Sequence, residues 1–251
     1  MCLLLIKNIS VVIIAQNAQE TIKECLESLK DFSEVILYLN NSTDSTKDIA
    51  KKFDNVKIID GDFLGFGPTK NKAASFAKNS WIFSLDSDEI VNNSLISELK
   101  SLSLKNENEV FIIKRDNYFL NKKIKYSGWG KDYLVRIYNK NRYQFNDNIV
   151  HEKIALTKES KKTILKNSFK HLAVIDISQF LSKINSYSKL AASEKKTCSF
   201  ITVLAKPMFA FIKTYFIQLG ILDGYQGFVI AISDANGRFY RYLQRYINCK
   251  K

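Results

Sequence analysis

The stretch WIFSLDSDE, residues 81–89, decides the fold class of this chain. Its first five residues are apolar apart from Ser84, which is typical of a strand buried on both faces, and Asp86 and Asp88 follow at the carboxyl end. In open α/β sheets, ligands bind in the crevice outside the carboxyl ends of the strands. Mg²⁺ and Mn²⁺ take carboxylate oxygens together with the phosphate oxygens of a ligand. The stretch therefore predicts a metal-diphosphate site, although Asp-Ser-Asp also suits a turn or a helix cap.

Strand and helix patterns alternate before this stretch. Short apolar runs predict strands at 9–15, 34–39 and 56–59. Apolar residues at helical spacing, or a capping residue before such a pattern, predict helices at 20–29, from Ser42 or Thr43 to about Phe53, and at 69–78. Short links between alternating strands and helices imply parallel strands with right-handed crossovers. The predicted fold class is α/β, with a Rossmann-like, mostly parallel central sheet flanked by helices.

The pattern changes in the second half of the chain. Segments rich in strand-forming residues are expected at 110–114, 133–138 and 149–154, and the chain becomes mostly helical after Asp176. No internal repeat or low-complexity linker separates these parts. We therefore expect one continuous domain followed by a helical C-terminal extension.

The composition indicates an anionic partner. The 251 residues include 38 Lys and Arg against 25 Asp and Glu, a formal net charge of +13. A nucleic acid, a membrane surface or a phosphorylated small molecule would each complement this charge. The four cysteines have neither paired nor metal-ligand spacing, so we expect reduced thiols in a reducing compartment. The apolar start is too short for a signal peptide, and no 18 uncharged apolar residues run together, so no transmembrane helix is expected.

Several motifs stand in a definite order along the chain. They are a strand ending near Asn17, the turn Ser42-Thr43-Asp44, the segment LGFGPTKNKA at 64–73, and Asp86 to Glu89. This order resembles family-2 glycosyltransferases with the GT-A fold. Further segments are SGW at 127–129 with Asp132, VHE at 150–152, KP at 206–207 and LDGYQG at 222–227. They make the resemblance closer to the branch that adds glucose to the inner-core heptose of bacterial lipopolysaccharide or lipooligosaccharide.

The resemblance covers nearly the whole chain and implies its organisation. A GT-A catalytic domain would span residues 1–175, with a nucleotide-sugar half at about 8–105 and an acceptor half at about 106–175. A helical, basic and aromatic extension would occupy residues 176–251.

The resemblance also implies an inverting, metal-dependent hexosyltransferase. It would move a hexose, glucose in this branch, from a UDP-sugar such as UDP-glucose to heptose in a lipid-linked core oligosaccharide. Another surface glycan or a protein acceptor stays open as an alternative. Because the departing diphosphate gains charge, Mg²⁺ or Mn²⁺ held by Asp86 and Asp88 would stabilise it, and Lys70 would add a second positive contact.

Three carboxylates compete as the base that takes the proton of the acceptor hydroxyl: Glu152, Asp132 and Glu89. We favour Glu152, because the His-Glu pair is a polar interruption of an otherwise apolar strand. His151 is a candidate metal ligand beside the two aspartates. The alternatives are a hydrogen-bonded histidine at position 151, a surface charge at Glu152, and a helix or turn cap at Asp132.

Donor-binding residues are expected at the ends of the strands and in the loop and helix that follow the third strand. They are Ala15, Asn17, Asn40, Asn41, Asp44, Lys70, Asn71, Asp86 and Ser87. Asp44 alternatively complements the dipole of the helix that follows it. One position departs from the family pattern, because Leu39 stands where an Asp usually contacts the nucleotide base. Either following Asn would replace that contact, which leaves the identity of the base open.

The C-terminal extension combines an apolar, aromatic face with basic residues. The apolar stripe is Leu204, Met208, Phe211, Tyr215 and Leu219, and the basic residues are Arg238, Arg241 and Arg245. This combination suits an interfacial helix on an anionic bilayer, while the alternative is packing on the catalytic domain. We expect a cytoplasmic protein that is peripherally associated with the inner membrane, near a lipid-linked acceptor.

Two other classes of protein were weighed against this one. A nucleotidyltransferase shares the sheet and the paired carboxylates, but it normally has a glycine-rich basic loop after the first strand, where this chain has Gln16-Asn17-Ala18-Gln19. A non-enzymatic nucleic-acid or glycan binding protein with a degenerate donor site would explain the positive charge and the aromatic residues. No recognised nucleic-acid motif is present, so no nucleic-acid partner is expected.

Overall fold

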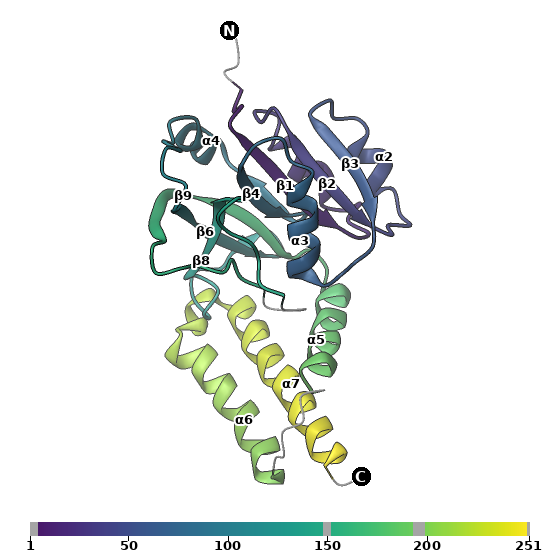
Figure 1. The fold of residues 1–251 in the computed structure, drawn as a ribbon. Helices are drawn as coiled ribbons and strands as arrows, with labels where there is room; N and C mark the ends of the chain where they lie inside the picture. The colour runs from purple at the N-terminus through teal and green to yellow at the C-terminus, as the bar shows by residue number, and fades with distance from the viewer. Residues whose placement is uncertain (1–4, 148–151, 193–198, 250–251) are drawn as a thin grey trace. The chain divides into compact units, whose positions relative to one another are not determined.

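The computed structural model describes residues 5–147, 152–192 and 199–249. The chain forms two compact units. The first contains residues 1–115 and 133–171, and the second contains residues 116–132 and 172–251. Figure 1 labels the elements of both units.

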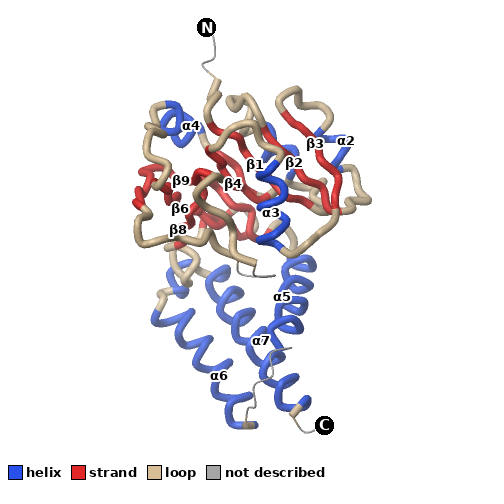
Figure 2. The backbone as a smooth tube through the Cα atoms, in the orientation of Figure 1, coloured by secondary structure: helices blue, strands red, loops and turns tan. Residues whose placement is uncertain are grey.

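Four parallel strands form the core of the first unit and confirm the α/β prediction (Figures 1 and 2). They are β1 (Ile9–Ala15), β2 (Val35–Asn40), β3 (Val56–Gly61) and β4 (Trp81–Asp86). Every residue of β1 and β2 is buried, as expected of parallel strands covered on both faces. Since β1 pairs with both β2 and β4, the ends of these three strands lie at the same edge of the sheet.

The sheet continues with strands from the second half of the chain. They are β5 (Glu89–Val91), β6 (Glu109–Phe119), β8 (Asp132–Asn139) and β9 (Lys161–Val174), and the short β7 (Lys122–Lys123) pairs with β6. The strand order is β3-β2-β1-β4-β8-β6-β9-β5. Antiparallel pairing of β5 with β9 places Glu89 opposite His171. The sequence analysis missed β9, because its many lysines hide the strand pattern.

Helices cover both faces of the parallel sheet. On one face, α1 (Ile22–Glu27), α2 (Thr46–Ala50) and α4 (Asn93–Lys100) pack on a core that includes Ile13 and Leu39. On the other face, α3 (Phe66–Ser75) packs through Ala73 and Ala74 against Val12 and Ile14. The predicted caps of α2 were wrong, since its N-cap residue is Ser45, and α3 begins three residues before its predicted start. Gly65, with φ 101°, allows this early start.

The predicted strand at 149–154 is only partly within the described residues. Of its described part, Ile154 forms an isolated bridge with Phe145 instead of a regular strand. Asn71 on α3 holds the same segment, because its side chain both accepts from the Phe145 amide (2.8 Å) and donates to the Phe145 carbonyl (2.9 Å).

The second unit is mostly helical. It contains α5 (Ile177–Ala192), α6 (Phe200–Ile212), a π-helix, η1 (Lys213–Ile217), a 3₁₀ turn, η2 (Gly220–Asp223), and α7 (Tyr225–Asn248). Both α5 and α6 pack against α7 (Figure 1). Residues 116–132 also belong to this unit, and the Asp223 carboxylate accepts hydrogen bonds from the backbone amides of Lys125 and Tyr126.

The apolar stripe predicted in the C-terminal extension is largely exposed. Only Val203 and Ala210 are buried on α6, whereas Leu204 and Met208 are exposed. The stretch Phe200–Ile217 has the length and composition of a membrane span, and only 17% of it is buried, unlike the core helix of a globular domain. The sequence criterion of 18 uncharged residues excluded it because Lys206 and Lys213 lie within it.

Candidate active site

Two loops at the ends of β1 and β2 are joined by side-chain hydrogen bonds. Asn17 Oδ1 accepts from the Thr43 amide (2.8 Å), and Asp44 Oδ2 accepts from the Gln19 amide (3.0 Å). Slight burial disfavours the Asp44 carboxylate, but hydrogen bonds from Thr46 and Gln19 lower the pKa of Asp44 from its usual value. Asn17 and Asp44 therefore shape the two loops at the edge of the sheet. These loops lie close to Ala15, the buried last residue of β1.

The end of β2 explains the departure at position 39. The Leu39 side chain is buried in the hydrophobic core. Because successive residues of a strand point to opposite faces, Asn40 points the other way. Asn40 is buried too, and its Oδ1 has no hydrogen-bond partner among the described residues. Asn41 follows in a left-handed conformation, with φ 51°. The orphaned oxygen of Asn40 is thus an acceptor in need of an N–H donor.

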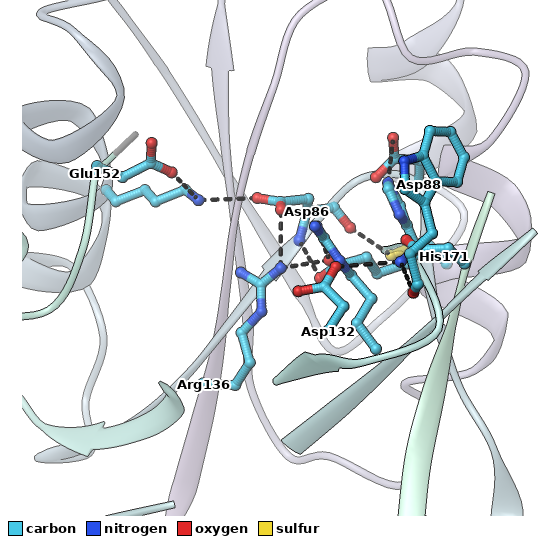
Figure 3. Close-up of polar contacts among 12 residues, drawn as sticks. Asp86, Asp88, Asp132, Arg136, Glu152 and His171 are labelled. Atoms are coloured by element: carbon cyan, nitrogen blue, oxygen red, sulfur yellow. Dashed lines mark hydrogen bonds and ion pairs between the residues drawn. The ribbon is translucent and has the colours of Figure 1, made fainter. Parts of the chain in front are cut away.

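A network of ion pairs surrounds Asp86 at the carboxyl end of β4 (Figure 3). Its Oδ1 lies 2.9 Å from Lys70 Nζ, and its Oδ2 lies 3.0 Å from Arg136 Nη2. Lys70 Nζ also contacts Glu152 Oε1 at 2.7 Å. Burial opposes the ionisation of Asp86, but Lys70 and Arg136 outweigh it and hold the pKa of Asp86 well below its usual range. The carboxylate therefore stays ionised between two cations.

Glu89 lies beneath this network with none of its surface exposed. Its Oε2 accepts from the Asp86 amide (3.0 Å), and Arg136 Nη2 donates to its Oε1. Arg115 Nη1 lies 3.4 Å from the same oxygen. Burial, only partly offset by Arg136, raises the pKa of Glu89 to about 7. Glu89 thus orients Asp86 and Arg136 from below and has no exposed oxygen to offer a substrate.

Asp88 is paired with a histidine from β9. Asp88 Oδ2 lies 3.5 Å from His171 Nε2, and both side chains are partly exposed (Figure 3). Ser87, which lies between Asp86 and Asp88 in the chain, is half-buried. No group of three or more His, Cys, Asp or Glu side chains with metal-binding geometry occurs in the part of the chain that the structure describes. The protein thus offers one carboxylate and one imidazole at this point.

Two predicted site residues remain, His151 and Asp132. His151 lies outside the described residues. Asp132 belongs to the second compact unit, where its Oδ2 accepts from Asn117 Nδ2 at 3.1 Å.

Three residues of the cluster were missed by the sequence analysis: Arg115, Arg136 and His171. None belongs to a short motif, and all three reach Asp86, Asp88 or Glu89 from strands whose order the local pattern does not reveal. One signal was available for His171, since the chain has only two histidines and only the other was considered.

Comparisons with known proteins agree with this architecture. The family model described as glycosyl transferase family 2 matches residues 10–168. A glycosyltransferase of Rickettsia typhi that carries no further assignment is 29% identical over 255 residues, covering 94% of this chain and 85% of that protein. The poly(ribitol-phosphate) beta-glucosyltransferase of Bacillus spizizenii is 32% identical over 114 residues, which cover 41% of this chain and 18% of that protein.

Among solved structures, S. aureus TarS 1–349 in complex with UDP aligns with a TM-score of 0.49 and 15% identity, covering 97% of this chain and 91% of that one. The family match spans the parallel sheet and the strand-end carboxylates, together with most of β9. The chain therefore belongs to glycosyl transferase family 2 and is a glycosyltransferase with a GT-A type of fold.

Proposed function

We propose that this enzyme transfers glucose, with inversion, from UDP-glucose to a lipid-linked core oligosaccharide of the lipopolysaccharide or lipooligosaccharide type, with heptose as the accepting sugar. One observation carries the donor half of this proposal: Asp88 and His171 lie at the end of β4 and on β9, next to the Lys70–Asp86–Arg136 network. The name of the Bacillus spizizenii relative, a beta-glucosyltransferase, supports glucose as the transferred sugar. The acceptor rests on the resemblance of the sequence motifs.

Asp88 and His171 fit a divalent cation. Their nearest side-chain atoms are 3.5 Å apart. Metal–ligand bonds of about 2.1 Å place two adjacent ligands of an octahedral ion about 3 Å apart, so a small closure would suffice. When bound, the cation would neutralise the charge that develops on the departing diphosphate. The imidazole favours Mn²⁺ over Mg²⁺, because nitrogen ligands bind transition metals more strongly.

For Asp86 we propose a role other than the metal contact that its motif suggested. Both of its oxygens are taken by Lys70 and Arg136, so it serves to position these two cations. Lys70 is itself buried, and its ion pairs with Asp86 and Glu152 offset the cost of burying its charge. Its ammonium group is thereby held ready for the diphosphate.

Asn40 is our candidate for contact with the nucleotide base. Its buried Oδ1 lacks a donor among the described residues, and uracil carries an N–H group that would satisfy it. Leu39 then need not contact the base, because it belongs to the core. Asn17, Asn41 and Asp44 would shape the surrounding loops.

Glu152 is the proposed base. In the transfer, the acceptor oxygen forms a bond to the anomeric carbon as the bond from that carbon to the diphosphate breaks, and the hydroxyl proton passes to a carboxylate. Glu152 is partly exposed and sits beside Lys70, whereas Glu89 is completely buried. Asp132, the first residue of β8, stays the rival base.

The exposed apolar face of α6 supports an anionic membrane surface as a further partner. Ile201 is 76% exposed and Met208 is 65% exposed, and Lys206 lies on the same helix. An interfacial helix of this kind gains free energy both from burying apolar side chains and from attracting anionic lipids. We expect cosedimentation with anionic vesicles at low salt, weakened by high salt.

The test of the proposed reaction is release of nucleoside diphosphate from a panel of nucleotide-sugars, with Mn²⁺ or Mg²⁺ present and then chelated. We expect UDP-glucose to be turned over with purified core oligosaccharide, and the Asp86→Ala/Asp88→Ala double variant to be inactive. Turnover of another sugar would correct the donor. Failure of the folded enzyme to bind any nucleotide-sugar would overturn the proposal.

A further inference from the structure

The second compact unit contains a cavity of its own, of about 380 Å³. Its walls come from the loop at 127–129, from α5, from the region of the π-helix and from α7. The volume falls in the range of small-molecule binding sites. None of the residues that line it belongs to the donor-binding, metal or base residues discussed above.

Two arginines give the cavity an excess of positive charge. Arg238 Nε is paired with Asp234 Oδ1 at 3.2 Å. Arg241 lies one turn away on α7, and its Nε is buried without a hydrogen-bond partner among the described residues. A buried donor on a charged group costs more than an ordinary hydrogen bond when it is left unsatisfied. The buried Nε–H group of Arg241 therefore lacks an acceptor among the described residues. A carboxylate or phosphate oxygen of a ligand in the cavity would supply one.

Aromatic and neutral polar side chains form the rest of the wall. The rings of Trp129 and Phe180 meet edge to face, 6.4 Å apart. Gln218 and Ser233 add an amide and a hydroxyl group. A sugar ring has apolar C–H faces that pack on aromatic rings and hydroxyl groups that bond to such polar side chains. Rings, neutral polar groups and a positive charge together match a sugar that carries an anionic substituent.

The backbone around the cavity is held in unusual conformations. Ser127, Gly128 and Leu219 all have positive φ angles, of 59°, 79° and 57°. The π-helix Lys213–Ile217 ends two residues before Leu219, and such helices are frequent at functional sites. Strained residues persist only where their surroundings fix them, and they cluster at ligand sites.

The LDGYQG segment supplies the contacts that fix this backbone. Asp223 accepts from the amides of Lys125 (3.0 Å) and Tyr126 (2.9 Å) and from the Ser127 hydroxyl (3.1 Å). A side chain at Gly227 would place its Cβ 1.8 Å from the carbonyl oxygen of Gly220, so glycine is required for this close approach. The motif therefore builds the wall that carries Trp129, a purpose outside the donor site.

We propose that this cavity binds a sugar bearing a phosphate or carboxylate group, with its ring against Trp129 and its anion on Arg241. The proposal rests on the proposed function in one respect, since it assigns the sugar to the acceptor glycan. It names a charged acceptor sugar as the feature by which this enzyme selects its substrate.

The experiment is a binding titration of the full chain, followed by saturation-transfer NMR and by tryptophan fluorescence. The probes are glucose 6-phosphate, glucuronate, glucose, inorganic phosphate and UDP. Trp81 is buried in the core, so a fluorescence change on binding reports Trp129. We expect the two charged sugars to bind at least about tenfold more tightly than glucose, and Arg241→Gln to remove this advantage. Arg142→Gln, at a surface arginine of the first unit, is the matched control and should bind as the wild type does.

Three results with the sugars would overturn the proposal. They are equal binding of charged and uncharged sugars, unchanged binding by Arg241→Gln, and displacement of the charged sugars by UDP, which would assign the cavity to the donor. If inorganic phosphate bound as tightly as glucose 6-phosphate, the cavity would be a simple anion site. That result would also contradict the proposal. UDP binding by wild type and Arg241→Gln tests the donor site separately, so failure of the proposed function is distinguishable from failure of this inference.

Discussion

The two compact units of this enzyme differ in how their positively charged side chains are paired. In the first unit, the cations around Asp86 are paired with carboxylates of the protein: Lys70 with Asp86 and Glu152, and Arg136 with Asp86 and Glu89. In the second unit, Arg241 buries a donor that nothing in the described chain satisfies. The first arrangement is organised before any ligand arrives, whereas the second is completed only by one. In our proposal the paired network binds the donor, and the cavity with the unsatisfied Arg241 binds the acceptor sugar.

The largest effect is expected from removing the proposed base in the first unit. Glu152→Gln keeps the size of the side chain but cannot take a proton, so transfer should fall by about 10³-fold while UDP binding is retained. Initial rates of UDP release with acceptor measure this. Glu159→Gln, at a side chain that is 75% exposed, is the control. If Glu152→Gln kept activity within tenfold of wild type, Glu152 would be excluded as the base. Asp132 would then be the next candidate to test.

The second largest effect is expected on the Mn²⁺ requirement of the first unit. His171→Ala removes one of two protein ligands, so about 100-fold more Mn²⁺ should be needed for half-maximal rate. Lys162→Ala, at an exposed position on the same strand, should leave the metal titration unchanged. A titration curve for His171→Ala that overlays the wild type would remove His171 from the metal site.

Weakening the wall of the cavity should destabilise the second unit and leave donor binding by the first unit unchanged. Asp223→Asn weakens three hydrogen bonds to residues 125–127 and should destabilise the second unit by about 2 kcal/mol. Hydrogen exchange should quicken at the amides of Lys125 and Tyr126, with UDP binding unaltered. Asp54→Asn, at an exposed loop, serves as control. Unchanged exchange at these amides would show that Asp223 does not hold the loop.

The smallest effect is expected at the apolar face of α6. Ile201→Ser/Met208→Ser removes two exposed apolar side chains and should lower vesicle partitioning by about tenfold or more. Ile164→Ser, at a 61% exposed residue of the first unit, should partition as the wild type does. Equal loss in both variants would mean that binding is not located on α6.

The sequence predicted the parallel half of the fold well and the antiparallel half poorly. The strands at 9–15 and 81–86 are buried on both faces, so their apolar runs are continuous and easily recognised. β9 carries four lysines within its 14 residues and resembles a solvated segment. A strand is therefore easiest to predict from its local sequence when both of its faces are buried.

The site was predictable where it follows one strand and hidden where distant strands meet. Asp86, Asp88 and Lys70 stand in recognisable motifs, but their partners Arg136 and His171 come from β8 and β9. The motif also suggested that Asp86 binds the metal directly. In the structure its two oxygens contact Lys70 and Arg136, a pairing that depends on side chains 16 and 50 positions away, so no window of sequence contains it.

We propose above all that a cation and the diphosphate of the donor meet at Asp88 and His171. Electron paramagnetic resonance of Mn²⁺ tests it directly, because the signal of free Mn²⁺ disappears on binding. We predict that the wild-type enzyme binds Mn²⁺ tightly when UDP is present, and that Asp88→Ala loses this binding whereas Asp48→Ala, at an exposed aspartate, keeps it. Equal Mn²⁺ binding by wild type and Asp88→Ala in the presence of UDP would contradict the account.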